Sequence, residues 1–236
     1  MTRAALLCCI ALLSATLGAR SAAAELVCLP LDGTFDDVSG NGNHAVANGG
    51  TFAGGCASGS CIELDGSNDH LTIASSQLDD LATFTYSAWI APDAHGDRQV
   101  VSKRSSNREF RLKNDNLRGC VVASPNACST SEETIPLGLW TMVTMTYTHP
   151  GAVRLYVNGT EVDYDKQSSS ASDLSSDNTT AFFIGRRSSG DRHFDGRIDE
   201  LRVYDRAISS AEVQDLYDTG GACRVLPIVT AVAPTS

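Results

Sequence analysis

The sequence has few basic residues and few aromatic ones. Lys and Arg number 18 against 28 Asp and Glu in a chain of 236 residues, and Phe, Trp and Tyr make up 6%. The net charge of −10 argues against a nucleic-acid or anionic-membrane partner, because both select a positively charged surface. No apolar run reaches the roughly 20 residues that cross a bilayer. We therefore expect no transmembrane segment.

Sequence signals of catalysis are also missing. There is no G-x-S-x-G nucleophile elbow and no phosphate-binding loop, and the five histidines are scattered along the chain. Asp199 and Glu200 are neighbours on a predicted strand, so their side chains should point to opposite faces. They cannot flank one glycosidic bond as the paired carboxylates of glycoside hydrolases do. We therefore expect a protein that is not an enzyme.

Residues 1–24 have the pattern of a secretory signal peptide. Arg3 supplies the positive charge, Leu6 to Leu17 form the apolar segment, and Ala22 to Ala24 form a small-residue cleavage site. The alternative is an uncleaved N-terminal anchor. Cleavage would leave 16 basic against 28 acidic residues, a net charge near −12. We expect a secreted, extracellular protein, in the periplasm or at the cell surface if the host is bacterial.

Six cysteines follow the predicted cleavage site, namely Cys28, Cys56, Cys61, Cys120, Cys128 and Cys223. An even number behind a signal peptide predicts disulfide bonds. Many pairings are open, but closeness in sequence favours Cys56–Cys61 and Cys120–Cys128, which leaves Cys28 for Cys223. A metal cluster is the alternative, and the C-x4-C and C-x7-C spacings are poor for zinc.

Short strand-like runs separated by Gly, Asn, Asp and Ser fill the chain from Leu26 onward, which predicts an all-β fold. Asn158-Gly159 predicts a tight hairpin. The polar stretch 165–180 is expected to be a loop, and residues 223–236 a C-terminal tail. Trp89 and Trp140 lie within apolar runs and are expected to pack in the core, with a sugar-stacking surface as the alternative.

The last predicted strand spans 198–204 and is followed by a short helix. Period-two alternation places Asp199 on the same face as Leu201 and Val203, so a carboxylate should point inward. Such a group needs hydrogen-bond donors, a cation or a metal, because an unpaired buried carboxylate is costly. After the strand, Ser209 and Glu212 form a capping box for a helix over 210–217.

The segment Gly196 to Val213, GRIDELRVYDRAISSAEV, resembles the C-terminal signature of the laminin-G-like, concanavalin A-like jelly roll. Residues 29–46 and 61–73 resemble the family's opening loop and its next strand pair. The resemblance covers residues 25–222 and implies an antiparallel two-sheet β-sandwich with one short C-terminal helix. It also implies that the chain ends are neighbours, which suits a Cys28–Cys223 bond. Members are usually binding or adhesion modules, often for glycans and often with calcium, and some relatives cleave glycans.

Two groups of side chains are candidate sites. Calcium takes hard oxygen ligands, and the expected donors are Asp32, Asp36, Asp37, Asn41, Asn43 and Asp199. The alternative is a loop whose Asp and Asn side chains satisfy local backbone groups.

The second group is basic and consists of Arg98, Lys103, Arg104, Arg108, Arg111, Arg186 and Arg187. If they share one face of a sheet, their charges would bind carboxylates or sulfates of a glycan. The alternative is a solvated face of ion pairs.

We therefore expect a secreted, non-catalytic module that binds an extracellular glycan, with structural calcium as support. One alternative is a structural or adhesive module that binds protein at a cell surface. The other is a diverged polysaccharide-cleaving enzyme, since Arg108-Glu109-Phe110-Arg111 resembles the R-x-E-x-R strand of alginate lyases with one residue too few.

Overall fold

The computed structural model describes residues 25–104 and 108–223. The predicted signal peptide, residues 1–24, lies outside the described residues, as does the predicted tail apart from Cys223. Within the described part, no helix has the length and apolar character needed to span a membrane.

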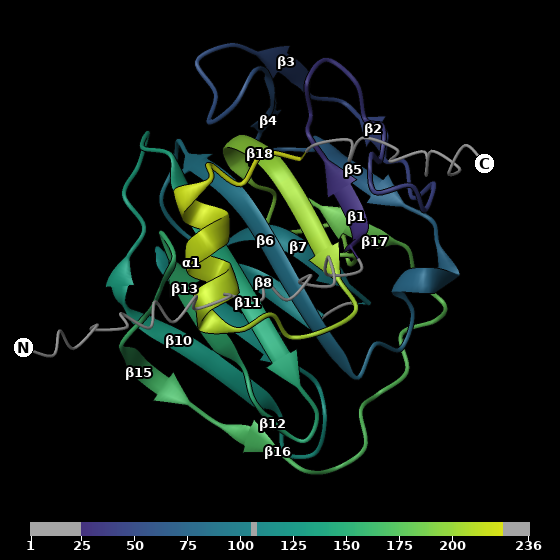
Figure 1. Cartoon of the computed structure of the whole chain (residues 1–236), viewed down its shortest axis with the longest axis vertical. Coiled ribbons are helices and arrows are strands. Elements are labelled where there is room, and N and C mark those ends of the chain that lie inside the picture. Colours follow the sequence, from purple (N-terminus) through teal and green to yellow (C-terminus); the bar gives the residue numbers. More distant parts are fainter. Residues whose placement is uncertain (1–24, 105–107, 224–236) are drawn as a thin grey trace, which may run out of the picture.

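Two antiparallel eight-stranded sheets form the molecule (Figure 1). Sheet A has the order β14 (Thr160–Glu161), β13 (Arg154–Val157), β11 (Thr141–Thr148), β6 (Thr83–Pro92), β18 (Asp195–Tyr204), β4 (Cys61–Asp65) and β3 (Thr51–Ala53), and β1 (Glu25–Leu29) also pairs with β18. Sheet B has the order β15 (Tyr164–Gln167), β10 (Ala127–Thr134), β9 (Asn116–Val121), β8 (Arg108–Lys113), β7 (Arg98–Lys103), β17 (Phe182–Ile184), β5 (His70–Ile73) and β2 (Val46–Asn48). A small pair is formed by β12 (Gly151–Ala152) and β16 (Ser169–Ser170). The predicted β-sandwich is confirmed.

The core lies between the two sheets and follows the predicted alternation. In β6, Phe84, Tyr86, Ala88 and Ile90 face sheet B, and their neighbours in β11 are Val143, Met145 and Tyr147. All are at most 2% exposed, and burial of this apolar area is the main term that stabilises the fold. The hairpin predicted at Asn158-Gly159 is present between β13 and β14, and both turn residues have a positive φ, +48° and +85°. Such a turn requires this conformation and Gly adopts it without strain.

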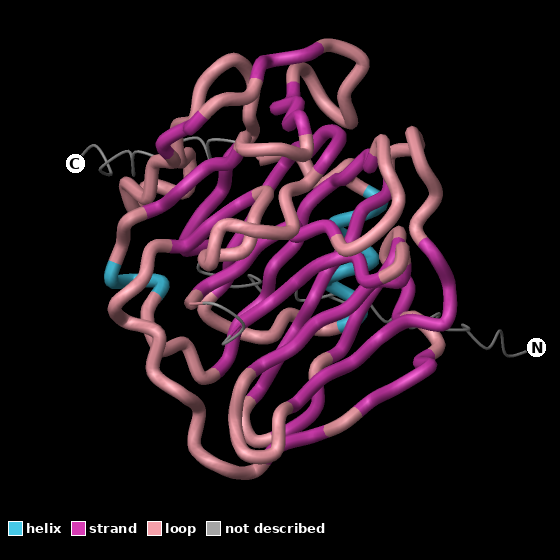
Figure 2. The backbone as a smooth tube through the Cα atoms, turned by 180° about the vertical axis from the view of Figure 1, so that it is seen from behind, coloured by secondary structure: helices cyan, strands magenta, loops and turns pink. Residues whose placement is uncertain are grey.

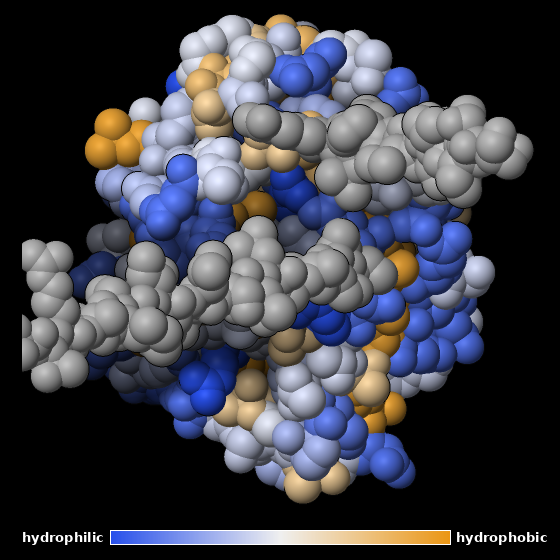
Figure 3. Space-filling view, viewed as in Figure 1, coloured by the Kyte–Doolittle hydropathy of each residue, from blue (hydrophilic) through white to orange (hydrophobic). Residues whose placement is uncertain are grey.

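The helix α1 (Ser210–Asp218) covers the outer face of sheet A. It begins with the predicted capping box, and Val213 packs on Met142, Tyr156 and Tyr204. Trp89 stacks on Tyr217 at 5.7 Å between ring centroids. It therefore packs against a hydrophobic cluster, as expected, but this is the cluster between α1 and sheet A and not the one between the two sheets. Figure 3 shows this face as mostly hydrophilic, with small separate hydrophobic spots.

Trp140 was also expected to pack in the core, but it belongs to neither hydrophobic cluster of the described residues. Its indole N–H donates to the Gly55 carbonyl at 2.9 Å, and Arg197 lies over the ring at 5.6 Å from its centroid. A 3-10 turn, η1 (Ser76–Leu78), lies between β5 and β6.

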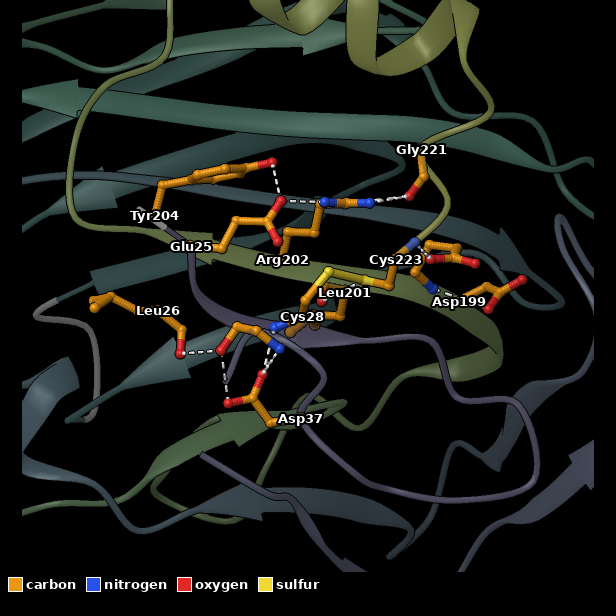
Figure 4. The surroundings of a disulfide bond; sticks show 12 residues. Glu25, Leu26, Cys28, Asp37, Asp199, Leu201, Arg202, Tyr204, Gly221 and Cys223 are labelled. Carbon is orange, nitrogen blue, oxygen red and sulfur yellow. Dashed lines mark hydrogen bonds and ion pairs between the residues drawn. A yellow bond between two sulfur atoms is a disulfide. The ribbon is translucent and has the colours of Figure 1, made fainter. Parts of the chain in front are cut away.

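Disulfide bonds join all three predicted cysteine pairs, Cys28–Cys223, Cys56–Cys61 and Cys120–Cys128. The first connects β1 to the segment after α1 (Figure 4). Beside it, the Arg202 guanidinium is paired with the Glu25 carboxylate and donates to the Gly221 carbonyl at 2.9 Å. The two ends of the described chain are therefore held side by side.

Some strands of sheet B, β10 and β15 among them, occur where the sequence predicted none. The strand β15 begins the stretch 165–180 that was expected to be a loop, and β10 has the weakly patterned sequence ACSTSEET. Its inward positions include Ser129 and Ser131, which are fully buried. Their hydroxyls donate to the Val153 and Glu133 carbonyls at 2.6 Å, so small hydrogen-bonded side chains replace the apolar ones that mark a strand.

In the part of the chain that the structure describes, no helix covers the outer face of sheet B. Figure 2 shows the molecule from behind, with sheet B running from the upper left to the lower right and α1 on the far side. Loops cross only part of this face. Several of the predicted basic residues lie on this open strand surface.

Candidate functional site

The strand β8 places two charged residues on the outer face of sheet B. Phe110 and Leu112 point into the core, so Glu109 and Arg111 point the other way. Arg111 is paired in register with Arg118 of β9. The outer face therefore carries two neighbouring guanidinium groups beside one carboxylate.

The loop after β17 brings three more arginines to the same face. The guanidinium of Arg186 lies over the Phe183 ring, 4.6 Å from its centroid. Arg192 and Arg187 reach the Glu109 carboxylate at N–O distances of 2.9 and 3.9 Å. We name the five residues Arg111, Arg118, Arg186, Arg187 and Arg192 the arginine cluster.

Three carboxylates partly neutralise the arginine cluster. Glu109 is buried among its partners, Asp97 pairs with Arg111 at 2.9 Å, and Asp191 pairs with Arg187 at 2.7 Å. Five guanidinium groups against three carboxylates leave the face positive on a chain whose net charge is −10. Burial, and then repulsion from Arg192, lowers the pKa of Arg111.

A groove of about 490 Å³ opens beside the arginine cluster, at the edge of sheet B formed by β8, β9, β10 and β15. Its lining is polar and consists of Lys113, Asn114, Asn116, Arg118, Thr130, Glu132, Asp165 and Lys166. Arg118 belongs to both the groove and the arginine cluster, and its guanidinium donates to the Thr130 hydroxyl at 2.8 Å. A ligand in the groove would therefore meet the cluster directly.

The predicted basic residues are divided by the fold. Arg111, Arg186 and Arg187 belong to the arginine cluster. Lys103 and Arg108 are paired in register and lie on the core side of sheet B, where they form ion pairs with Asp79 and Asp177. Arg104 donates to the Ser176 carbonyl, and Arg98 donates to the His193 carbonyl at 3.1 Å. The expectation that all seven share one face is wrong.

Arg118 and Arg192 lie in the same basic segments of the sequence, 98–118 and 186–197, but are not among the seven candidates. On β9 the alternation of Leu117, Arg118 and Gly119 indicates that Arg118 faces outward. Arg192 lies in a loop, where no period predicts its direction.

A second hollow, of about 390 Å³, lies at the end of β9 and is bordered by residues 173–177. Arg108 and Asp177 form its inner wall, and both side chains are at most 3% exposed. The Asp177 carboxylate also accepts a hydrogen bond from the Asp80 amide at 2.9 Å. This buried ion pair attaches the loop before β17 to sheet B.

The six expected calcium donors do not form one group. The Asp37 carboxylate accepts hydrogen bonds from the amides of Cys28, Ser39 and Asn43 at 2.9 to 3.0 Å. The side-chain amides of Asn41 and Asn43 donate to carbonyls of β1, and Asp36 lies beside His44 at the surface. These side chains fit the alternative, a loop held by local backbone contacts. Among residues 25–104 and 108–223, no three His, Cys, Asp or Glu side chains are placed to hold a metal.

Asp199 is fully buried, but on the other face of sheet A from the one expected. It pairs with Trp89 on the outer face, whereas Ile198 and Leu201 both face the core. A bulge at Glu200, whose φ is +49°, reverses the alternation. The Asp199 carboxylate accepts hydrogen bonds from the Ser58 and Glu200 amides, both at 2.9 Å.

Glu200 lies beside Asp199 and accepts a hydrogen bond from the Cys223 amide. Burial raises the pKa of Asp199 to about 7, with further contributions from Glu200 and Asp32. Burial likewise raises the pKa of Glu200 to about 7. The structure thus brings Asp32 and Asp199 together, as the sequence suggested, but with Glu200 in place of the Asn and Asp side chains of the 36–43 loop.

These two carboxyls predict a loss of stability with rising pH. Their pKa values in the folded protein, about 7, exceed those of the unfolded chain, near 4. The stabilising contribution is therefore complete below about pH 4 and is lost as the pH rises through 7. We expect the free energy of unfolding, measured by urea titration in chelator, to fall by on the order of 2 kcal/mol between pH 5 and pH 8.

The matched control is the double variant Asp199→Asn, Glu200→Gln, in which this fall should disappear. This comparison also separates the effect of the two carboxyls from that of His70. Burial lowers the pKa of His70, so the contribution of His70 to the free energy of unfolding rises with pH over the same interval. Equal pH dependence in parent and variant would contradict the assignment. Calcium binding stays a prediction from the sequence. If millimolar calcium raised the melting temperature of the parent but not of the double variant, Asp199 and Glu200 would be identified as calcium ligands.

Comparison with known proteins gives a family and a fold. A family model described as the concanavalin A-like lectin/glucanases superfamily matches residues 65–214. A search of curated proteins finds no significant match.

Similar solved structures include domain 4 of AbnA, a GH43 extracellular arabinanase from Geobacillus stearothermophilus, in complex with arabinotriose. It has a TM-score of 0.69 and 22% identity, and the alignment covers 83% of this chain and 98% of that domain. The binding domain of Paraclostridial Mosquitocidal Protein 1 has a TM-score of 0.61 and 18% identity, over 83% of this chain and 52% of that one.

Another similar structure is that of botulinum neurotoxin type C, whose cell entry depends on interaction with two ganglioside molecules. It has a TM-score of 0.64 and 11% identity, over 84% of this chain and 51% of that one. The chain thus spans nearly all of the arabinanase domain and about half of the toxin chains. At these identities the likeness shows the fold alone.

Proposed function

The chain belongs to the concanavalin A-like lectin/glucanases superfamily, and from this premise we propose that it is a non-catalytic module that binds an extracellular glycan through the outer face of sheet B. The observation that carries the proposal is the joined arginine cluster and polar groove on an open strand face. Hydroxyl-rich ligands need a dense set of hydrogen-bond donors and acceptors, which this lining supplies.

Two further observations support this proposal. The arabinanase domain of the same fold was solved with a bound arabinotriose. Three disulfide bonds in a small domain are typical of an oxidising, extracellular compartment.

The acidic residues of this face support binding more than catalysis. Glu109 is buried and held by Arg192 and Arg111, so its carboxylate is not free to transfer a proton or attack a sugar. Asp199 and Glu200 belong to sheet A, on the opposite side of the sandwich. No part of the proposal depends on calcium.

A screen of immobilised glycans with the purified protein tests this proposal. We expect at least one glycan to bind, and Arg118→Gln to weaken that binding by about tenfold, or about 1.4 kcal/mol. Arg154→Gln is the matched control, because Arg154 is an exposed arginine on β13 of sheet A, paired with Glu161. It should leave binding unchanged.

Three outcomes would contradict parts of this proposal. Equal losses in both variants would place the site elsewhere. Silence on all glycans, together with capture of a cell-surface protein, would favour an adhesive module. Shortened oligosaccharides after incubation with a bound glycan would show an enzyme.

A further inference from the structure

We propose that the arginine cluster recognises a negatively charged sugar unit, one that carries a carboxylate or a sulfate group. The inference rests on the proposed function and names the ligand class of the same face. Three features of the cluster support it: guanidinium groups without a carboxylate partner, crowding of like charges, and the lack of an open aromatic ring.

Two members of the cluster have no carboxylate partner. Among the residues that the structure describes, Arg118 makes its polar contact with the Thr130 hydroxyl, at 2.8 Å, and no carboxylate lies within ion-pair distance of Arg118 or Arg186. The Nε atoms of both are buried without a hydrogen-bond acceptor. Arginines that only solvate a surface are exposed or paired, whereas these two are half-buried with donors to spare.

Like charges are crowded in the middle of the cluster. Arg111 is only 5% exposed and lies between Arg118 and Arg192. Burial is the main cause of the lowered pKa of Arg111, and repulsion from Arg192 adds to it. The cluster has five guanidinium groups and only three carboxylate partners, so it keeps a net positive charge. A ligand anion placed here would gain attraction that a neutral hydroxyl would not, because the groups are partly desolvated.

Aromatic stacking is not available on this face. In the described strands of sheet B, a single Phe, Tyr or Trp side chain, that of Phe183, lies on the outer face. Arg186 covers its ring. Phe183 is 9% exposed. A neutral sugar would therefore find no exposed aromatic ring to stack on here. An anionic sugar would instead bind the guanidinium group of Arg186, which the Phe183 ring holds in place.

The cluster is long enough for more than one sugar ring. From Phe183 on β17 to Arg118 on β9 there are three strand intervals, or about 14 Å. At the Arg118 end the face continues into the polar groove. An oligosaccharide with one acidic unit over Arg186 or Arg111 would place its next units beside Arg118 and Thr130.

The test uses matched pairs of ligands on the full chain. One pair is a uronate-containing oligosaccharide and its carboxyl-reduced form, and the other is a sulfated oligosaccharide and its desulfated form. We expect one charged form to bind at least about tenfold more tightly than its neutral counterpart. Raising NaCl from about 50 mM to about 500 mM should remove most of the difference, because salt screens partly exposed charges.

Variants assign the preference to the cluster. Arg186→Gln should reduce the ratio between charged and neutral forms by about fivefold or more, and Arg154→Gln should leave the ratio unchanged. Melting temperatures of both variants report whether the fold is intact. The pair that shows the preference distinguishes carboxylate from sulfate recognition.

Equal affinity for charged and neutral members of both pairs would overturn this inference and leave glycan binding intact. Binding of a neutral glycan alone would do the same. Failure of every glycan, charged or neutral, would instead reject the proposed function together with the inference.

Discussion

The double variant Cys28→Ala, Cys223→Ala is expected to lose about 4 kcal/mol of its free energy of unfolding. The bond joins residues 195 apart in sequence, so it removes most of the freedom that the ends of the unfolded chain would have. Cys28 is buried on β1, which pairs with β18 in the centre of sheet A. Loss of the bond should therefore loosen a strand next to the core. Urea titration at neutral pH measures the effect, and its slope should rise because the unfolded chain without the bond is less compact.

The matched control for this prediction is Cys120→Ala, Cys128→Ala. That bond closes a loop only eight residues long between neighbouring strands, so its removal should cost about half as much. Equal losses for the two bonds would contradict the argument. They would mean that the Glu25–Arg202 pair and the contacts around Gly221 hold the chain ends without the disulfide.

The second large effect is expected for Asp177→Asn, which should cost about 3 kcal/mol or more. The substitution keeps an oxygen that accepts from the Asp80 amide but removes the charge that faces Arg108. Arg108 is 3% exposed and would become a buried charge without its partner. The nearby Tyr86 hydroxyl does not replace that partner, because burial raises its pKa to about 12 and it stays neutral.

Two comparisons separate this effect from the loss of an ordinary ion pair. Arg154→Ala breaks the exposed pair with Glu161 and should cost less than about 1 kcal/mol. Arg108→Met combined with Asp177→Asn should recover much of the loss, because no buried charge remains. If Asp177→Asn cost as little as Arg154→Ala, water would have to reach the Arg108 guanidinium.

Most strands of the core could be predicted from alternation alone. Phe84, Tyr86 and Ile90 on β6 repeat with the period of a pleated strand, and burial selects such a pattern strongly. The strand β10 escaped prediction because Ser129 and Ser131 fill its inward positions. Their hydroxyls are satisfied by hydrogen bonds inside the protein, which a sequence pattern does not reveal.

The candidate site was only partly predictable, for a related reason. Alternation on β8 separates Arg108 from Arg111 and was sufficient to place them on opposite faces. For Arg192 no such signal exists, since it reaches Glu109 from a loop. For Asp199, a single bulge at Glu200 moved the carboxylate from the expected face to the opposite one.

The amino-acid sequence alone determined the two-sheet architecture, the capped helix over 210–217 and the pairs formed by its six cysteines. Apolar periodicity predicted an all-β fold, and the resemblance to the jelly-roll family implied its two sheets. A capping box predicted the helix, and short sequence distances predicted two cysteine pairs and left Cys28 for Cys223. Tertiary structure alone decided which arginines meet on the outer face of sheet B and which are buried against Asp79 and Asp177. The physical reason is that a charged side chain is positioned by partners far away in the sequence, whereas an apolar side chain need only face the core.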